Sequence, residues 1–332
     1  MRISYEEMHK ELTRILIKHG LERERAVLSA RLFADASRDG IYSHGLNRFS
    51  AFVRAIELGD VKVDAKPTLD ADLGVIERWN GNRGPGNLNA YACMQRAIAL
   101  AHEHTFGVVG LKNTNHWMRP GNYGLMAAEA GCIGILWTNT LPNMPPWGGQ
   151  DAKLGNNPIV FAIPNGEDPV LLDIAMSMFA YGKLESYARQ GRELPVDGGF
   201  DKEQRLTRDP AAILETQQAL PFGFWKGSGL ALALDLVGAA ISGGRTTCEV
   251  GELPRETEVS QVFMAIDLRR MPDSEAYAKK VKTTLQDLQT AVPRDPQHPV
   301  TYPGQNMMRV RRDNLLHGIP AEEAIWNAVK EM

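Results

Sequence analysis

The fold class depends on the stretch Gly74–Trp79 (GVIERW), which leads through Asn80 into the loop Gly81-Asn82-Arg83-Gly84-Pro85-Gly86. An apolar strand, a glycine-rich loop and a helix together suggest a G-x-G-x-x-G dinucleotide fingerprint. The spacing is wrong, because the third glycine would have to stand at position 89, which is Asn89. No acidic residue follows a second strand about twenty residues later, where it would contact a ribose. The sequence therefore predicts an ordinary loop ahead of a helix and excludes a Rossmann domain.

Outward from this loop, β-rich runs alternate with helical stretches. The runs predicted as strands are Gly74–Trp79, Phe106–Lys112, Cys132–Thr138, Ile159–Ile163, Val170–Asp173 and Val259–Leu268. The stretches predicted as helices are Asn87–His104, Tyr123–Ala130, Ser177–Gln190 and Ser228–Ser242. This mixture predicts an α/β layer built on a single mixed sheet.

Both ends of the chain are predicted to be helical. Ser4 followed by Glu7 is typical of a capping box, and two further helices should run from about Glu22 and from a cap at Ser43. Three helices are also expected near the C-terminus, at Ser274–Thr290, Met307–Leu316 and Ala321–Val329. We expect the two ends to form one discontinuous helical domain, residues 1–70 and 272–332, around an α/β domain of residues 71–271.

Composition narrows the class of protein further. The chain has 332 residues, enough for about two domains, and its 37 basic and 40 acidic residues give a net charge of −3. That balance argues against a nucleic-acid protein held by bulk positive charge. The charged start at Met1 shows no signal peptide, and the longest apolar stretch, Gly229–Gly243, contains Asp235 and predicts a buried core helix rather than a membrane span. Three widely spaced cysteines fit a reducing cytoplasm.

The segment Ser43-His44-Gly45-Leu46-Asn47-Arg48 is a candidate for chemistry. With Ser43 as the helix cap, His44 and Arg48 lie four residues apart on one edge, away from the apolar face. Histidine can give a proton near neutral pH, and arginine can hold a carboxylate through two parallel hydrogen bonds. On spacing alone, a solvated histidine beside a surface arginine is favoured.

Two more segments combine polar groups with an exposed position. Asn113-Thr114-Asn115-His116-Trp117 ends an apolar run, and such loops often carry catalytic groups in α/β proteins. Gly223–Gly229 places Lys226 among glycines at a helix start, which suits an anion as well as it suits a tight loop. The order of its residues differs from that of a P-loop, and no histidine spacing predicts a metal site.

Taken in order along the chain, these segments resemble the type-2 malate/L-lactate dehydrogenase family, whose members use NAD(P) without a Rossmann fold. The segments that carry the resemblance are Ser43-His44-Gly45 with Arg48, Asn113 to Trp117, Pro145-Pro146-Trp147-Gly148-Gly149, Leu154-Gly155-Asn156-Asn157-Pro158, Leu172-Asp173 and Pro303-Gly304.

The resemblance implies a homodimer of interlocked domains with the cofactor extended over a mixed sheet. It places His44 or His116 as the proton donor. The cofactor contacts that it implies are Pro169, Val170, Leu171, Leu172, Asp173, Ile174, Ala175, Trp225, Lys226, Gly304, Gln305 and Asn306.

The function expected from this resemblance is reduction of a small 2-oxo or 2,3-dioxo acid with NADH, or alternatively NADPH. Arg48 would orient the substrate carboxylate, one histidine would protonate the forming alkoxide, and the other would polarise a carbonyl. Neither a metal, a nucleic acid nor a membrane is expected to take part. Three alternatives stay open: an oxidising 2-hydroxy acid dehydrogenase, a cyclic imino acid reductase, and a ligand-binding relative without turnover.

Overall fold

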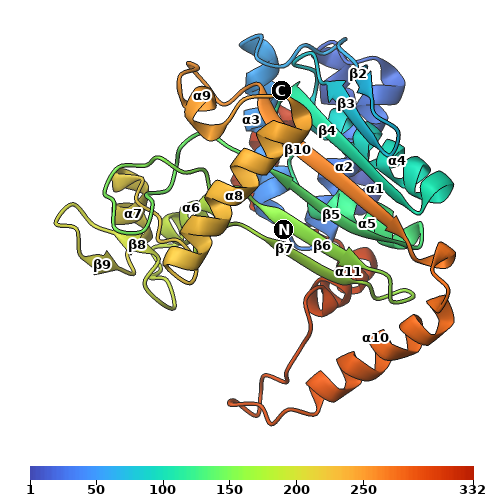
Figure 1. The fold of residues 1–332 in the computed structure, drawn as a ribbon. Helices are drawn as coiled ribbons and strands as arrows, with labels where there is room; N and C mark the ends of the chain where they lie inside the picture. Colours follow the sequence, from blue (N-terminus) through green and yellow to red (C-terminus); the bar gives the residue numbers. More distant parts are fainter.

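The computed structural model describes residues 1–332 and is organised around a seven-stranded mixed sheet (Figure 1). Only β3 and β4 run parallel, and every other neighbouring pair is antiparallel. In spatial order the strands are β2 (Thr68–Asp72), β3 (Ile76–Asn80), β4 (Phe106–Thr114), β10 (Val259–Asp267), β5 (Cys132–Thr138), β6 (Ile159–Ile163) and β7 (Val170–Ile174). The predicted mixed sheet is confirmed.

The glycine-rich loop connects β3 to helix α4 (Gly86–His104) and serves close packing. A Cβ on Gly86 would lie 2.2 Å from the Asn115 carbonyl oxygen and 2.3 Å from that of His116. Only glycine therefore lets the start of α4 approach the segment that follows β4. The exclusion of a Rossmann fold is confirmed, and this glycine positions the His116 backbone.

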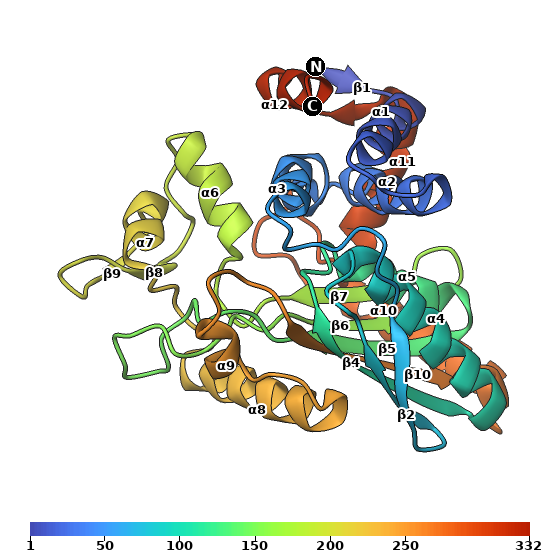
Figure 2. The same cartoon turned by 90° about the horizontal axis from the view of Figure 1, so that it is seen from above.

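Helices cover both faces of the sheet, as Figure 2 shows. On one face, α4 and α5 (Gly121–Glu129) enclose the largest apolar core, which includes Leu136, Tyr123 and Phe263. On the other face, α8 (Trp225–Ser242) packs Ala231 and Leu234 against the sheet.

The stretch Gly229–Gly243 forms a helix as predicted, but it is a buried core helix on one side only. Its sheet-facing side is buried, but Leu232, Leu236 and Val237 are 47, 54 and 47% exposed. The stretch is apolar all round, whereas the sheet covers only one side of it, and nothing else in this chain packs on the outer side.

Segments from both chain ends share a second apolar core. Strand β1 (Arg2–Ile3) pairs with β11 (Ile319–Pro320). The helices that contribute to this core are α1 (Tyr5–Lys18), α2 (Arg23–Arg38), α3 (Leu46–Glu57) and α12 (Glu323–Lys330). This core also takes in Leu88 and Met118, and the division into a helical and an α/β domain stays a prediction.

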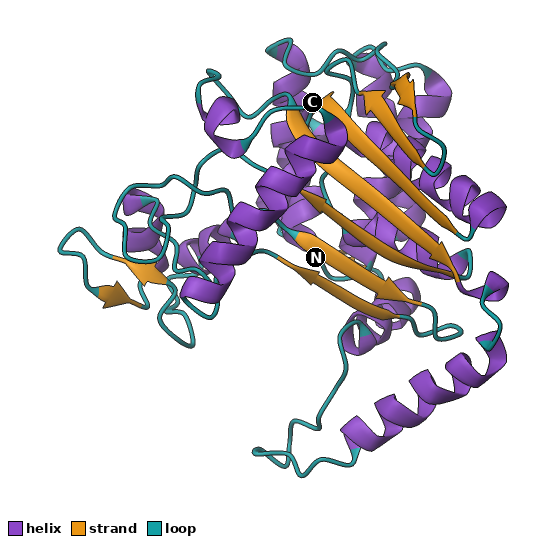
Figure 3. Ribbon diagram, viewed as in Figure 1, coloured by secondary structure: helices purple, strands orange, loops and turns teal.

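Helix α10 (Ser274–Gln289) lies apart from both cores. None of its residues is buried, and Figure 3 shows it projecting from the sheet as an arm. Its polar sequence carries only a narrow stripe of half-buried residues, Tyr277, Val281 and Leu285. Helix α11 (Gln305–His317) returns the chain to the body beside α2.

A small lobe lies beyond β7. It contains α6 (Tyr181–Arg189), β8 (Gly199–Phe200), β9 (Leu206–Thr207) and α7 (Pro210–Thr216), and α9 (Thr247–Gly251) follows α8. Helix α6 begins four residues later than predicted, because Ser177 bridges Pro221 and Met178 donates to the Leu220 carbonyl. None of the helices has the length and apolar character needed to cross a membrane.

Candidate active site

His44 ends the short 3₁₀ helix η1 (Tyr42–His44), and Arg48 lies in the first turn of α3. The predicted cap at Ser43 is wrong, because α3 is capped at Gly45 and Ser37 of α2 accepts the Leu46 N–H at 2.8 Å. Ser43 Oγ instead lies 3.0 Å from His44 Nδ1. A neighbouring helix replaces the local cap and frees Ser43 to contact the histidine.

His116 lies in a firmly held loop after β4. The Asn115 amide donates to the carbonyls of Arg83 and Gly84, each at 2.9 Å, and Trp117 is fully buried. The backbone N–H of Met118 donates to His116 Nδ1 at 3.0 Å. His116 is therefore the tautomer that carries its proton on Nε2.

The two histidine rings are stacked against each other, and both line two neighbouring cavities. Their centroids are 6.0 Å apart, and their planes differ by 21°. We call the cavity of about 250 Å³ that contains Arg48 the Arg48 cavity. The other, of about 480 Å³ and lined by alternate residues of β7, is the β7 cavity.

The Arg48 cavity has a positive and a negative side chain. Arg48 and Glu256 both line it, and Arg48 makes no ion pair. An unpaired guanidinium in a half-enclosed space is suited to binding a carboxylate in a bidentate manner.

The β7 cavity contains four of the predicted cofactor contacts: Leu171, Asp173, Ala175 and Gly304. Strand side chains alternate between faces, so Val170, Leu172 and Ile174 do not line it, and Pro169, which precedes β7, does not line it either. Gly304 has a φ of +95°, and a Cβ there would lie 2.9 Å from the Leu171 nitrogen. The start of α11 therefore packs directly against β7. Trp225, Lys226, Gln305 and Asn306 line neither cavity.

Burial and positive charge keep both histidines neutral. Burial, with added repulsion from Arg48 and Arg119, lowers the pKa of His44 to about 4. Burial, followed by Arg48 and His44, holds the pKa of His116 well below its ordinary value. Binding an anion at Arg48 would remove a large part of the repulsion and raise both pKa values.

Glu256 and Tyr181 also line the Arg48 cavity, and neither is predicted from the sequence. Glu256 precedes β10 in a charged loop, and Tyr181 begins α6, so neither had a local signal. Only the sheet order, with β10 between β4 and β5, predicts that a residue preceding β10 lies near the ends of those strands.

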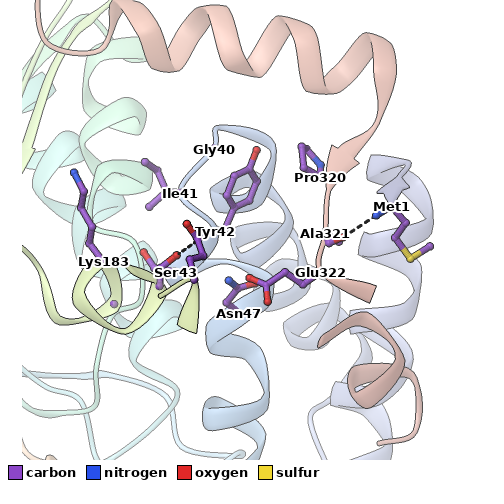
Figure 4. Close-up of a pocket in the computed structure, with 13 residues that line it drawn as sticks. Met1, Gly40, Ile41, Tyr42, Ser43, Asn47, Lys183, Pro320, Ala321 and Glu322 are labelled. Atoms are coloured by element: carbon purple, nitrogen blue, oxygen red, sulfur yellow. Dashed lines mark hydrogen bonds between the residues drawn. The ribbon is translucent and has the colours of Figure 1, made fainter. Parts of the chain in front are cut away.

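A third cavity of about 640 Å³ lies on the other side of Ser43, between α6 and the two chain ends (Figure 4). Lys183 belongs to both this cavity and the β7 cavity. The Met1 ammonium donates to the Ala321 carbonyl at 3.1 Å on the opposite side.

One group of metal-ligand type lies away from these cavities, formed by His102, Cys132 and Asp267. Asp267 is already engaged, because Arg269 donates to both of its oxygens and His102 Nδ1 lies 2.8 Å from Oδ2. The group therefore forms an ion-pair and hydrogen-bond cluster with Arg269, in which both Asp267 oxygens already have partners.

The sequence matches the malate/L-lactate dehydrogenase family over residues 3–330, and the chain belongs to that family. It is 42% identical over 335 residues to the 2,3-diketo-L-gulonate reductase of Mannheimia succiniciproducens, and the match covers 100% of both chains.

Solved structures of dehydrogenases resemble this chain over its whole length. Sulfolactate dehydrogenase from Methanocaldococcus jannaschii is 30% identical with a TM-score of 0.90, covering 100% of this chain and 96% of that one. Malate dehydrogenase from Entamoeba histolytica, at 24% identity and a TM-score of 0.94 over 100% of this chain and 96% of its own, shows the same fold. The protein is therefore an oxidoreductase of a family whose members act on hydroxy and oxo acids, and the family implies a nicotinamide cofactor.

The residues present fit such a cofactor. Helices α8 and α11 begin without side-chain caps at Phe224 and Gly304, although Lys226, Gly227 and Gln305 already donate their backbone N–H groups to nearby carbonyls. The exposed Lys226 ammonium at the start of α8 makes no ion pair in the protein and is available to a phosphate. Asp173 lines the β7 cavity and accepts one N–H, from Gly121 at 3.0 Å. The remaining carboxylate oxygen is able to accept a hydroxyl or amide of a cofactor.

Proposed function

We propose that this protein reduces a small 2-oxo or 2,3-dioxo acid with NADH or NADPH, and that its substrate is 2,3-diketo-L-gulonate, reduced to 3-keto-L-gulonate. One observation carries the proposal. The histidine pair stands between a cavity with an unpaired arginine and a cavity lined by Leu171, Asp173 and Ala175. A carboxylate held by Arg48 would bring the adjacent carbonyl to the two histidines, next to the β7 cavity in which the cofactor is expected.

The nicotinamide, when bound, supplies the hydride. His44 is the proposed proton donor. Its Nδ1 faces the Ser43 hydroxyl, which can accept a hydrogen bond, so the doubly protonated ring is accommodated. His116 Nδ1 faces an N–H donor, so a second proton there would set two donors against each other. His116 therefore stays neutral and donates a hydrogen bond from Nε2 to a carbonyl oxygen.

Arg48 couples substrate binding to the protonation of His44. The substrate carboxylate compensates the guanidinium charge, which is one cause of the low His44 pKa. His44 then takes up a proton when the acid binds and gives it to the alkoxide as it forms. A 2,3-dioxo acid presents a carbonyl to each histidine, which a simple 2-oxo acid does not.

The test is loss of reduced-nicotinamide absorbance with a panel of acids and both cofactors. We expect the highest kcat/KM with 2,3-diketo-L-gulonate. Higher kcat/KM with oxaloacetate or pyruvate, or with a cyclic imino acid, would favour another activity of the family. No turnover with any acid would leave a ligand-binding relative.

Cofactor placement gives a separate prediction. Lys226 is exposed at the uncapped start of α8, and we propose that the cofactor pyrophosphate binds there. Lys226→Met should weaken NADH binding by about 1–3 kcal/mol, the range for one charged hydrogen bond. The matched control is Arg83→Met in the glycine-rich loop, which should change affinity little. Cofactor fluorescence titrations measure both, and a loss confined to the Arg83 variant would contradict the placement.

We also propose that the protein is a homodimer, in which the outer side of α8 is covered by the second subunit. On this side four apolar residues of one helix are exposed together: Leu230, Leu232, Leu236 and Val237. A contiguous patch of this kind is typical of an interface, whereas scattered single apolar residues are common on any surface. Leu232→Glu with Leu236→Glu should yield monomers in sedimentation velocity. The control Leu73→Glu, at a position that is 61% exposed elsewhere, should leave the dimer intact. A wild-type monomer at micromolar concentration would refute the proposal. We also propose, from the three widely spaced cysteines, that the protein is cytoplasmic.

A further inference from the structure

Glu256 is the acidic side chain of the Arg48 cavity, and it is held in place from one side only. Its Oε2 accepts the backbone N–H of Leu141 at 3.2 Å. Its Oε1 makes no contact of this kind with the protein. Arg48 and Glu256 line the same cavity without forming an ion pair, so each charge is available to a ligand.

The other polar groups around them are largely engaged with one another. The Tyr181 hydroxyl donates to the Asn143 carbonyl and lies 3.3 Å from that of Gln217. The Asn143 amide donates to Asn156 Oδ1 at 3.1 Å, and the Thr140 hydroxyl donates to the Leu141 carbonyl at 3.0 Å. The groups left to recognise a ligand include the two histidines and the Asn156 Nδ2 amide, and the charged ones are the Arg48 guanidinium and the Glu256 carboxylate.

We infer that Glu256 determines substrate specificity by accepting hydrogen bonds from a neutral, hydroxylated tail and repelling a second carboxylate. The inference rests on the proposed function, because it needs the substrate carboxylate at Arg48. Hydroxyl groups are donors, and hydrogen bonds to a charged acceptor are the strong ones. A dicarboxylate would place a negative group near Glu256 in a cavity of only about 250 Å³.

The environment of Glu256 makes this discrimination effective. Burial raises the pKa of the carboxyl group, while the Leu141 N–H and Arg48 partly oppose that rise. Glu256 is half-buried, so its carboxylate has fewer water donors than one at the surface, and hydroxyl groups of a ligand are worth more to it. The substrate class is therefore a polyhydroxy 2-oxo or 2,3-dioxo acid rather than an oxo dicarboxylic acid.

The experiment compares Glu256→Gln with the wild type on three substrates that share a 2-oxo acid head or its 2,3-dioxo form. These are 2,3-diketo-L-gulonate with a hydroxylated tail, oxaloacetate with a second carboxylate, and pyruvate with a methyl group. Glutamine keeps the shape and an oxygen for the Leu141 N–H. We expect kcat/KM to fall roughly 10- to 100-fold for the hydroxylated acid. It should rise several-fold for oxaloacetate and change little for pyruvate.

The control is Glu252→Gln, because Glu252 shares a neighbouring surface hollow with Glu256 but does not line the Arg48 cavity. It should leave all three substrates unchanged. Glu256→Asp keeps the charge and should still discriminate against oxaloacetate. A uniform loss on all three substrates with Glu256→Gln, or no change in their ratios, overturns the inference. Failure of the wild type to reduce any of them contradicts the proposed function instead.

Discussion

Replacing His44 by alanine should lower turnover by roughly 10²–10⁴, the range for losing a general acid. The expectation follows from the contacts of the two rings. His44 can become doubly protonated against the Ser43 hydroxyl, whereas His116 accepts the Met118 N–H at Nδ1. Single-turnover measurements of NADH oxidation with saturating substrate isolate the chemical step.

The matched variants use glutamine, whose amide N–H can replace a donor at Nε2 but cannot deliver a proton. His116→Gln should therefore recover a large part of the activity that His116→Ala loses, and His44→Gln should recover none. If both alanine variants kept near-wild-type turnover, neither histidine would be the acid. Rescue at position 44 instead of 116 would reverse the two roles.

Arg48→Lys should fail to restore activity even though it keeps the positive charge. Lysine lacks the planar fork that binds both carboxylate oxygens, and a single ammonium cannot align the carbonyl with the histidines. We expect kcat/KM for oxo acids to fall roughly 10- to 100-fold, the cost of losing a charged hydrogen bond. The pKa of His44 should also respond less to substrate, which proton uptake on binding would measure.

Two controls test whether the loss comes from the contact between Arg48 and the substrate carboxylate. A neutral dicarbonyl has no carboxylate, so its slow reduction should change little in the Arg48 variant. Equal losses on both substrates would make Arg48 a structural residue. Arg54→Lys, on the same helix with a side chain that is 67% exposed, should leave both activities unaffected.

Local pattern predicted most of the sheet because its central strands are continuous apolar runs. The bounds of β5 and β6 match the predicted runs, and β7 differs by one residue at its end. Patterns fail where a contact with another segment sets the end of an element. Ser37 capping α3 in place of Ser43, and the bridge from Ser177 to Pro221, are both of this kind.

The candidate site, like the fold, could be predicted from the sequence only in part. His44, Arg48 and His116 stood in short polar segments that sequence could single out, and the structure brings all three to one cavity. Sequence left open which histidine donates the proton, because the answer depends on what lies against each Nδ1. It also gave no signal for Glu256, whose place depends on a strand far along the chain lying in the middle of the sheet.

By itself, the sequence determined the mixed α/β class, the absence of a dinucleotide fingerprint and the polar segments that contain His44, Arg48 and His116. These follow from spacing and residue chemistry, which act over a few neighbours. The tertiary structure alone decided that Arg48 has no partner, that His116 carries its proton on Nε2 and that Glu256 faces the same cavity. These depend on β10 inserting between β4 and β5 and on η1 meeting the loop after β4. Such contacts join residues more than seventy positions apart, where no local pattern reaches.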